Sequence, residues 1–309
     1  MNIKPARLAY THSFNLGDNI QTIATEQFLG NNPISIERHE LAQYNGGSVF
    51  LLMQGYFFAD DIHCSFPPSE KITPVFVGFH IEDTPVTRTR YAQKDILDYL
   101  KKFEPIGCRD NSTVDFLVGN GIDAYLTRCL TLTFPKRDEK IKGNKVFFID
   151  CEWLQPNLFT SKKFNQLYAR AEFLTQIVDG KINCKLSDTE KQKMAVERLE
   201  KLRNEAKLVV TSRLHIASPC VAMGIPVVLI PKSDSSRYDF IRDIIPVYQA
   251  NRFKLFYNKP RLKTFLQSFV NVFYTRIINW NPTPPDIENL RAEIKNNVQV
   301  QIQKAMEKC

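Results

Sequence analysis

The stretch from Val209 to Ile230 constrains the fold of this chain more than any other. Two runs of β-branched and aliphatic residues, 209–211 and 227–230, flank a segment of helical length that ends at Gly224. Two strands that are joined by a helix run parallel, because an antiparallel pair needs only a short hairpin. The stretch therefore predicts a strand–helix–strand unit, and with it an α/β fold that is built on parallel sheets.

The polar corner of this unit holds Ser212, Arg213 and His215 and is the first candidate site. In open parallel sheets, ligands bind beyond the carboxyl ends of the strands, where the following helices begin. A helix N-terminus attracts anions, and a nearby arginine strengthens the attraction. A histidine packed in the core and a solvated arginine are the structural alternative. The close spacing of the two side chains favours a site for an anionic ligand.

Pro219 interrupts the helix that is predicted after this corner. Proline has no backbone N–H, and its ring clashes with the carbonyl group four residues earlier. The helix therefore either begins late, which would leave 213–218 as an exposed loop, or is kinked.

The N-terminal segment repeats the order of strand, polar loop and helix. A short strand over 7–10 leads into a loop with Asn15, Gly17 and Asp18, and apolar residues at helical spacing follow over 19–29. Asp18 is the expected N-cap, because its carboxylate can accept from the first free N–H groups of the helix. Asp18 is therefore either only a helix cap or a residue that faces a ligand.

Arg109 occupies the same kind of corner as Arg213. It lies where a predicted short strand over 106–110 runs into a corner before a predicted helix over 111–118. Two arginines at two helix N-termini are a suitable pair for an anionic donor, because the planar guanidinium matches carboxylate and phosphate oxygens. Pairing of Arg109 with a neighbouring carboxylate is the alternative.

Further polar residues follow other predicted strands. His80 follows one of them, and Ser235, Ser236 and Arg237 follow the second strand of the unit described first. One of the two serines is expected to cap the next helix, and the three side chains together suit a phosphate. A solvated turn is the alternative for 235–237.

The rest of the hydrophobic pattern divides the chain. It predicts further strands over 48–53, 74–79, 124–126, 129–134 and 146–149, and further helices over 91–103, 161–177, 262–273 and 287–308, with a capping box at 187–190 that begins another helix. The polar stretch 135–144 is the expected linker. We therefore expect an N-terminal α/β domain over 1–135, a second α/β domain over 145–280 and a terminal helix within 281–309.

Composition and charge exclude several classes of protein. No apolar run in the 309 residues approaches the roughly 20 that cross a bilayer, and the N-terminus is too short and polar for a signal peptide. The seven cysteines form no C-x-x-C pair, which predicts reduced thiols and no metal site. The net charge of +8 suits an anionic partner, but the basic residues are spread out and no recognition motif for nucleic acid is present.

Three short motifs resemble those of the polysaccharide pyruvyl transferase family. They are the loop 15–18 with Gln21 and Ala24 behind it, the pair Arg109-Asp110, and 212–215 with 224–228. The chain departs from the family pattern at Gln54 and His80, where glycine is usual, and at Cys129, where Asp-Pro is usual. The resemblance implies two Rossmann-like domains whose parallel sheets face each other across a cleft, the GT-B-like arrangement.

Members of this family transfer the enolpyruvyl carbons of phosphoenolpyruvate to a sugar. The resemblance implies a transferase that forms a pyruvate ketal on a sugar of a polysaccharide or glycan precursor and releases phosphate, with phosphoenolpyruvate as co-substrate and no cofactor. His215 would protonate the methylene carbon, and Asp18 would take the proton of the attacking hydroxyl. The expected donor-binding residues are Arg109, Arg213, Leu214, Ser235, Ser236 and Arg237, and the expected acceptor-binding residues are Asn15, Gly17 and His80.

Two other functions fit the same pattern. A glycosyltransferase of this architecture would place a nucleotide diphosphate at the same helix N-termini, and a sugar-binding scaffold protein would bind without releasing phosphate. We expect a cytoplasmic protein, and action at the inner face of the membrane stays open. A lipid-linked acceptor and peripheral contact with the membrane through the aromatic segment 253–280 stay open as well.

Overall fold

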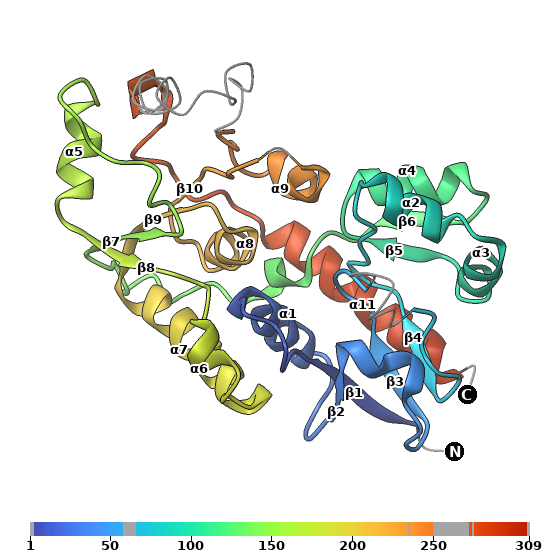
Figure 1. The fold of residues 1–309 in the computed structure, drawn as a ribbon. Coiled ribbons are helices and arrows are strands. Elements are labelled where there is room, and N and C mark those ends of the chain that lie inside the picture. Colours follow the sequence, from blue (N-terminus) through green and yellow to red (C-terminus); the bar gives the residue numbers. More distant parts are fainter. Residues whose placement is uncertain (1–2, 58–65, 234, 250–271, 274, 308–309) are drawn as a thin grey trace.

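The computed structural model describes residues 3–57, 66–233, 235–249, 272–273 and 275–307. The expected α/β fold with parallel sheets is confirmed (Figure 1). The first sheet has the order β2-β1-β3-β4, and its strands are β1 (Lys4–Ala9), β2 (Ile34–Glu37), β3 (Val49–Leu52) and β4 (Ile72–Val75). All of its strand pairs are parallel.

The second sheet repeats the topology of the first. It has the order β10-β9-β7-β8, and its strands are β7 (Lys145–Ile149), β8 (Ala171–Leu174), β9 (Ala206–Thr211) and β10 (Val227–Leu229). In both sheets the first strand lies between the second and the third, so the strand order reverses there. Ligands of open α/β sheets bind at such reversals. The loops that follow β1, β3, β7 and β9 are therefore the positions where a site is expected.

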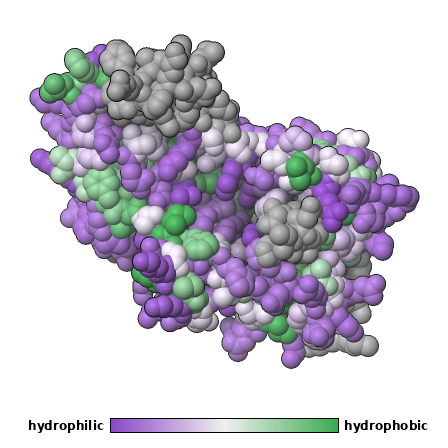
Figure 2. All heavy atoms as spheres, viewed as in Figure 1, coloured by the Kyte–Doolittle hydropathy of each residue, from purple (hydrophilic) through white to green (hydrophobic). Residues whose placement is uncertain are grey.

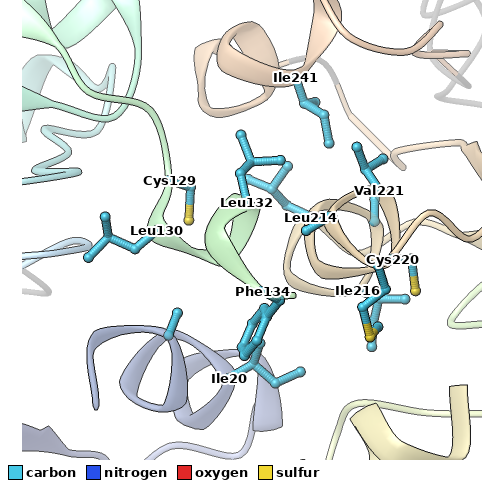
Figure 3. Close-up of a cluster of buried hydrophobic side chains, with 14 of the residues drawn as sticks. Ile20, Cys129, Leu130, Leu132, Phe134, Leu214, Ile216, Cys220, Val221 and Ile241 are labelled. Carbon is cyan, nitrogen blue, oxygen red and sulfur yellow. The ribbon is translucent and has the colours of Figure 1, made fainter. Parts of the chain in front are cut away.

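The first half of the chain, which contains the first sheet, and the second half, which contains the second sheet, share a hydrophobic core. Helices α1 (Leu16–Glu26), α7 (Asp188–Glu205) and α8 (Leu214–Ala222), the 3-10 helix η2 (Leu130–Thr133) and the terminal helix α11 (Glu288–Glu307) meet in it. Ile20, Leu130, Leu214 and Val221 are among its buried side chains (Figure 3). Because α11 packs on η2 and β4, the C-terminal end of the chain returns to the first half.

The remaining elements surround the two sheets. In the first half these are η1 (Arg38–Gln43), α2 (Pro85–Tyr91), α3 (Lys94–Lys101), β5 (Ile106–Cys108), α4 (Asn111–Gly119) and β6 (Ala124–Leu126). In the second half they are α5 (Lys162–Tyr168), α6 (Gly180–Asn183), η3 (Ser236–Tyr238) and α9 (Asp239–Arg242). Strands β5 and β6 form a parallel pair, and Phe79 bridges Gly55 on one side and Cys108 on the other. The carboxyl ends of β3 and β5 therefore lie along one edge.

Two predicted elements are wrong. The strand expected over 129–134 is η2, although leucine and threonine alternate there: Thr133 Oγ1 donates to the Leu130 carbonyl at 2.7 Å, and both faces are buried. The helix expected over 161–177 ends at Tyr168, and 171–174 pairs with β7 instead. In both segments, contacts with distant residues outweigh the local pattern.

Other predictions hold with shifted bounds. The capping box is confirmed, since Ser187 Oγ accepts from the Glu190 N–H and Glu190 Oε2 accepts from the Ser187 N–H. The strand expected over 74–79 is β4 at 72–75, and the helix expected over 91–103 is shortened to α3, with α2 before it.

Most of the helix expected over 262–273 lies outside the described residues, and the division into domains stays a proposal. In the described part of the chain, no helix combines the length and the apolar character that crossing a membrane requires.

Candidate active site

A cavity of about 210 Å³ lies where the two halves meet. Its lining comes from the start of α1 and from the loops after β8, β9 and β10, and consists of Asn15, Gly17, Gln176, Ser212, Arg213, Leu214, His215, Lys232, Ser233, Arg237 and Tyr238. In the space-filling view, hydrophilic side chains surround the hollow between the two halves (Figure 2). Six of the predicted site residues are thus in the lining, and Asp18, His80, Arg109, Ser235 and Ser236 are not.

His215 lies at a break in α8. The helix begins at Leu214, so it does not start late, and His215 has the non-helical dihedrals φ −83° and ψ 18°. Pro219 lies four residues further on and has no N–H to donate to the His215 carbonyl, which explains why the break falls there. The helix is therefore kinked, as the second alternative for Pro219 predicts. His215 is 5% exposed, and its Nε2 has no hydrogen-bond partner within the described residues.

The surroundings of His215 keep its imidazole uncharged. Burial lowers the pKa of His215 well below its ordinary value, and the positive charges of Arg109 and Arg237 lower it further. The imidazole is therefore neutral at neutral pH as long as no anion is bound. A bound anion offsets the arginine charges and raises this pKa again, because a nearby negative charge favours the protonated form.

Arg213 is held by an acidic residue from the neighbouring strand end. Asp150 follows β7, and its Oδ2 accepts from Arg213 Nε at 2.6 Å. The other carboxylate oxygen accepts from Thr175 Oγ1 at 2.6 Å, and Oδ2 also accepts from the Gln176 N–H at 3.1 Å. This pairing fixes the guanidinium at the cavity edge and uses its Nε. Sequence reasoning missed Asp150, although its position directly after a predicted strand is the same signal that identified Arg213.

Arg109 is the more deeply buried of the two predicted arginines. It is 2% exposed, and its Nε has no hydrogen-bond partner within the described residues. The Asp110 carboxylate is 3.8 Å from this Nε, and its oxygens already accept from His80 and Thr113. Burial lowers the pKa of Arg109, and Arg237 lowers it as well. The pairing of Arg109 with a neighbouring carboxylate, the alternative given above, is thus present as a long ion pair. It leaves Nε without a hydrogen-bond partner among the described residues, which is costly for a buried charge, so Arg109 is suited to an anionic ligand.

The segment 235–237 has the predicted cap. Ser235 Oγ accepts from the Arg237 N–H at 3.3 Å and begins η3, whereas Ser236 Oγ is buried and has no partner in the described part of the chain. Arg237 alone of the three lines the cavity. Lys232 and Ser233, from the same loop, also line it and were missed as site residues, although a polar loop after a strand end was the available signal.

The N-cap of α1 is Asn15, and the prediction of Asp18 is wrong. Asn15 has extended dihedrals, and its Oδ1 accepts from the Gly17 N–H at 3.0 Å. Asp18 lies inside the first turn and accepts from Ser13 Oγ at 2.6 Å and from Gln21 Nε2 at 3.3 Å. A Cβ at Gly17 would lie 3.2 Å from the Cβ of His215. Glycine therefore allows the N-termini of α1 and α8 to approach each other.

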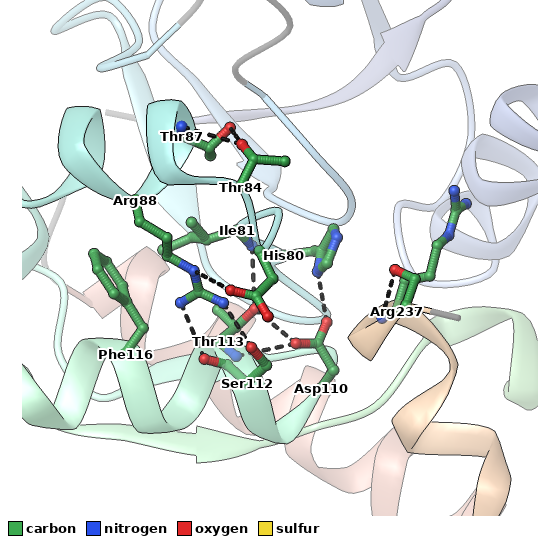
Figure 4. Close-up of polar contacts among 12 residues, drawn as sticks. His80, Ile81, Thr84, Thr87, Arg88, Asp110, Ser112, Thr113, Phe116 and Arg237 are labelled. Carbon is green, nitrogen blue, oxygen red and sulfur yellow. Dashed lines mark hydrogen bonds and ion pairs between the residues drawn. The ribbon is translucent and has the colours of Figure 1, made fainter. Parts of the chain in front are cut away.

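His80 forms a buried pair with Asp110 (Figure 4). Its Nδ1 lies 2.6 Å from Asp110 Oδ2, and Asp110 also caps α4 by accepting from the N–H and the hydroxyl of Thr113. Burial and the charge of Arg109 lower the pKa of His80 to about 4. Although burial raises the pKa of Asp110, the hydrogen bond and charge of His80 bring it below its ordinary value. The pair is therefore a neutral imidazole that donates from Nδ1 to a carboxylate.

Comparisons with known proteins found two distantly similar solved structures. A search of curated proteins found no match. Among solved structures, a functionally uncharacterized protein from Klebsiella pneumoniae subsp. pneumoniae is 13% identical, with a TM-score of 0.43 over 77% of this chain and 88% of that one. A candidate UDP-N-acetylglucosamine 2-epimerase from Listeria monocytogenes is 11% identical, with a TM-score of 0.41 over 94% of this chain and 78% of that one.

The family model gives a more specific result. The polysaccharide pyruvyl transferase model matches residues 15–234, a range that begins at the N-cap of α1 and includes Arg109, Arg213 and His215. The match covers well over half of the 309 residues. The chain therefore belongs to the polysaccharide pyruvyl transferase family.

Proposed function

We propose that this protein transfers the enolpyruvyl group of phosphoenolpyruvate to a sugar, closes a pyruvate ketal on two of its hydroxyls and releases phosphate. The observation that carries the proposal is that two arginine charges act on the buried imidazole of His215, whose Nε2 has no hydrogen-bond partner within the described residues. Arg213 and Arg237 line the cavity, and the buried Arg109 acts on His215 through its charge. This arrangement suits a ligand with two anionic groups and one carbon that must be protonated.

Phosphoenolpyruvate has these properties. Its phosphate and carboxylate each match a guanidinium, and the rigid planar fork of arginine holds such groups in a fixed orientation. The negative charge of the ligand raises the pKa of His215, so donor binding supplies the proton that the methylene carbon takes up. Asn15 and Gly17, at the start of α1 in the same cavity, and His80, outside the cavity lining, are the proposed contacts of the acceptor sugar. We place the reaction in the cytoplasm, on a precursor of a capsule or exopolysaccharide.

Ligand-induced stabilisation separates this proposal from a glycosyltransferase. We expect phosphoenolpyruvate at 100 times its Kd to stabilise the folded protein by about 2.7 kcal/mol and therefore to raise its Tm. A panel of nucleotide sugars at the same concentration should leave the Tm unchanged. A rise with a nucleotide sugar and none with phosphoenolpyruvate would favour the glycosyltransferase. Release of phosphate from phosphoenolpyruvate across a panel of sugar acceptors then tests the transfer itself and separates an enzyme from a binding protein.

Arg213 provides a test of the donor site. We expect Arg213→Ala to weaken phosphoenolpyruvate binding by roughly 1.5–3 kcal/mol, the range for hydrogen bonds to charged groups. Asp150→Asn should give a smaller loss, because Arg213 keeps its charge but loses the carboxylate that orients it. Titration calorimetry measures both. Equal affinity in the Arg213→Ala variant and the wild type would remove Arg213 from the donor site.

A further inference from the structure

The His80–Asp110 pair is an acid–base unit that the donor site does not use. Asp110 is fully buried and is fixed by three hydrogen bonds, from His80 and from the N–H and hydroxyl of Thr113. The backbone of His80 is fixed as well, because its N–H donates to the Gly55 carbonyl at 3.0 Å. The imidazole is thus held in one place at the carboxyl edge of the first sheet (Figure 4).

The hydrogen bond to Asp110 determines which ring nitrogen carries the proton. A carboxylate only accepts hydrogen bonds, so Nδ1 of the neutral imidazole is the protonated nitrogen. The other nitrogen, Nε2, then presents a lone pair, and it has no hydrogen-bond partner among the described residues. Asp110 orients the imidazole as the carboxylate of a catalytic triad does, and it favours the charged form, which offsets part of the lowering of the His80 pKa by burial and Arg109.

His80 and His215 belong to one electrostatic environment. Each lies close enough to Arg109 and Arg237 for both arginine charges to lower its pKa, and protonation of His80 lowers the pKa of His215 further. His80 comes from the first half of the chain and His215 from the second. One imidazole is fixed by a carboxylate, whereas the other has a buried Nε2 without a hydrogen-bond partner among the described residues. The two rings therefore suit opposite roles.

We propose that His80, oriented by Asp110, is the general base that takes the proton of the attacking acceptor hydroxyl. This inference rests on the proposed function and names a residue for the step that the sequence assigned to Asp18. The Asp18 carboxylate already accepts from Ser13 and Gln21, and Asp18 is absent from the cavity lining. His80 is also outside that lining, so the acceptor would bridge from His80 toward the donor cavity.

The proposed step balances without an oxidant or reductant. The hydroxyl oxygen bonds to C2 of phosphoenolpyruvate, the O–H bond breaks, and His80 Nε2 receives the proton. The electrons of the C2–C3 double bond take a proton from His215, which makes the methyl group. His80 then returns its proton to the departing phosphate, and the second hydroxyl adds to C2 while its proton restores His215. The two acceptor hydroxyls thus lose two protons in total. The methyl group gains one proton, and the released phosphate gains the other.

Removal and replacement of the base test this assignment. We expect His80→Ala to lower turnover about 10²-fold, the lower end of the range for general base catalysis, while phosphoenolpyruvate still raises the Tm. Added imidazoles should restore part of the rate in a saturable manner, and more basic imidazoles should restore more. A ring that is only structural would not give this dependence on basicity. His39→Ala removes an imidazole in η1 outside the cavity lining and should keep the wild-type rate, with or without added imidazole.

The outcomes separate failure of this inference from failure of the proposed function. If the wild type releases phosphate and His80→Ala turns over within threefold of it, His80 is not the base. The assignment would also be overturned if His80→Ala lost activity, still bound phosphoenolpyruvate and was not rescued by added imidazole. A larger loss of turnover in Asp18→Asn than in His80→Ala would overturn it as well. A wild type that releases no phosphate with any acceptor would instead count against the proposed function.

Discussion

Turnover of His215→Gln should fall roughly 10²–10⁴-fold, because glutamine keeps some of the size and hydrogen bonding of the imidazole but cannot deliver a proton to carbon. The ring is buried at the break in α8, and its Nε2 has no hydrogen-bond partner in the described part of the chain, so a polar replacement of similar length should disturb the fold little. Affinity for phosphoenolpyruvate, measured by titration calorimetry, should change much less than turnover. A variant with near-wild-type turnover would leave His215 a binding or packing residue.

The pH dependence provides a second test of His215. In the free protein its pKa lies well below the ordinary value, so the proton-donating form is present only on the acid side of that pKa and is lost as pH rises through it. kcat/KM, which reports the free enzyme, should therefore fall from low pH onward. kcat should persist to higher pH, since bound phosphoenolpyruvate raises the same pKa.

Donor binding at neutral pH should consequently take up a proton. Calorimetric titrations in buffers of different ionisation enthalpy measure this uptake, and His215→Gln should abolish it. The control His39→Gln should keep the uptake, because His39 lies in η1 and does not line the cavity. Binding without any proton uptake in the wild type would mean that His215 stays neutral in the complex and cannot be the acid.

The features that the sequence predicted correctly depend on residues close together in the chain. A capping box needs only Ser187 and Glu190, and a strand that ends at a polar corner is visible within ten residues, as at Arg213. Pro219 predicts a break because its clash partner, His215, is four residues away. Local sequence therefore located both the corners of the sheets and the conflict inside α8.

The features that it missed depend on partners far apart. Asp150 lies 63 residues from Arg213, and His80 lies 30 residues from Asp110, so neither pair can be recognised before the sheet order is known. The strand β8 is defined by its pairing with β7 rather than by its own pattern. The choice between Asn15 and Asp18 as N-cap depends on the residue at which the backbone takes up helical dihedrals. The pattern of polar and apolar residues in this loop does not determine that residue.

Replacement of Arg109 should affect both the affinity for phosphoenolpyruvate and the stability of the free protein. We expect Arg109→Met to weaken phosphoenolpyruvate binding by roughly 1.5–3 kcal/mol, about 10- to 150-fold in Kd. Arg109→Lys should not restore the affinity, because a lysine cannot make the two parallel contacts of a guanidinium. Arg128→Met is the matched control: Arg128 contacts the Phe240 carbonyl and Asp243 rather than the cavity, so its loss should lower stability and leave donor affinity unchanged.

The unliganded Arg109→Met variant should be no less stable than the wild type. Its guanidinium is buried, with Nε unpartnered among the described residues, and methionine fills similar space without the cost of burying a charge. Asp110, 3.8 Å away, keeps its hydrogen bonds from His80 and Thr113 when the arginine is removed. Removing that charge should also raise the pKa of His215, which an NMR titration of the imidazole measures, because Arg109 lowers it in the wild type. A Tm well below that of the wild type, with donor affinity kept, would instead make Arg109 a structural residue. The buried charge would then serve the fold, and the anion would have to be bound by Arg213 and Arg237 alone.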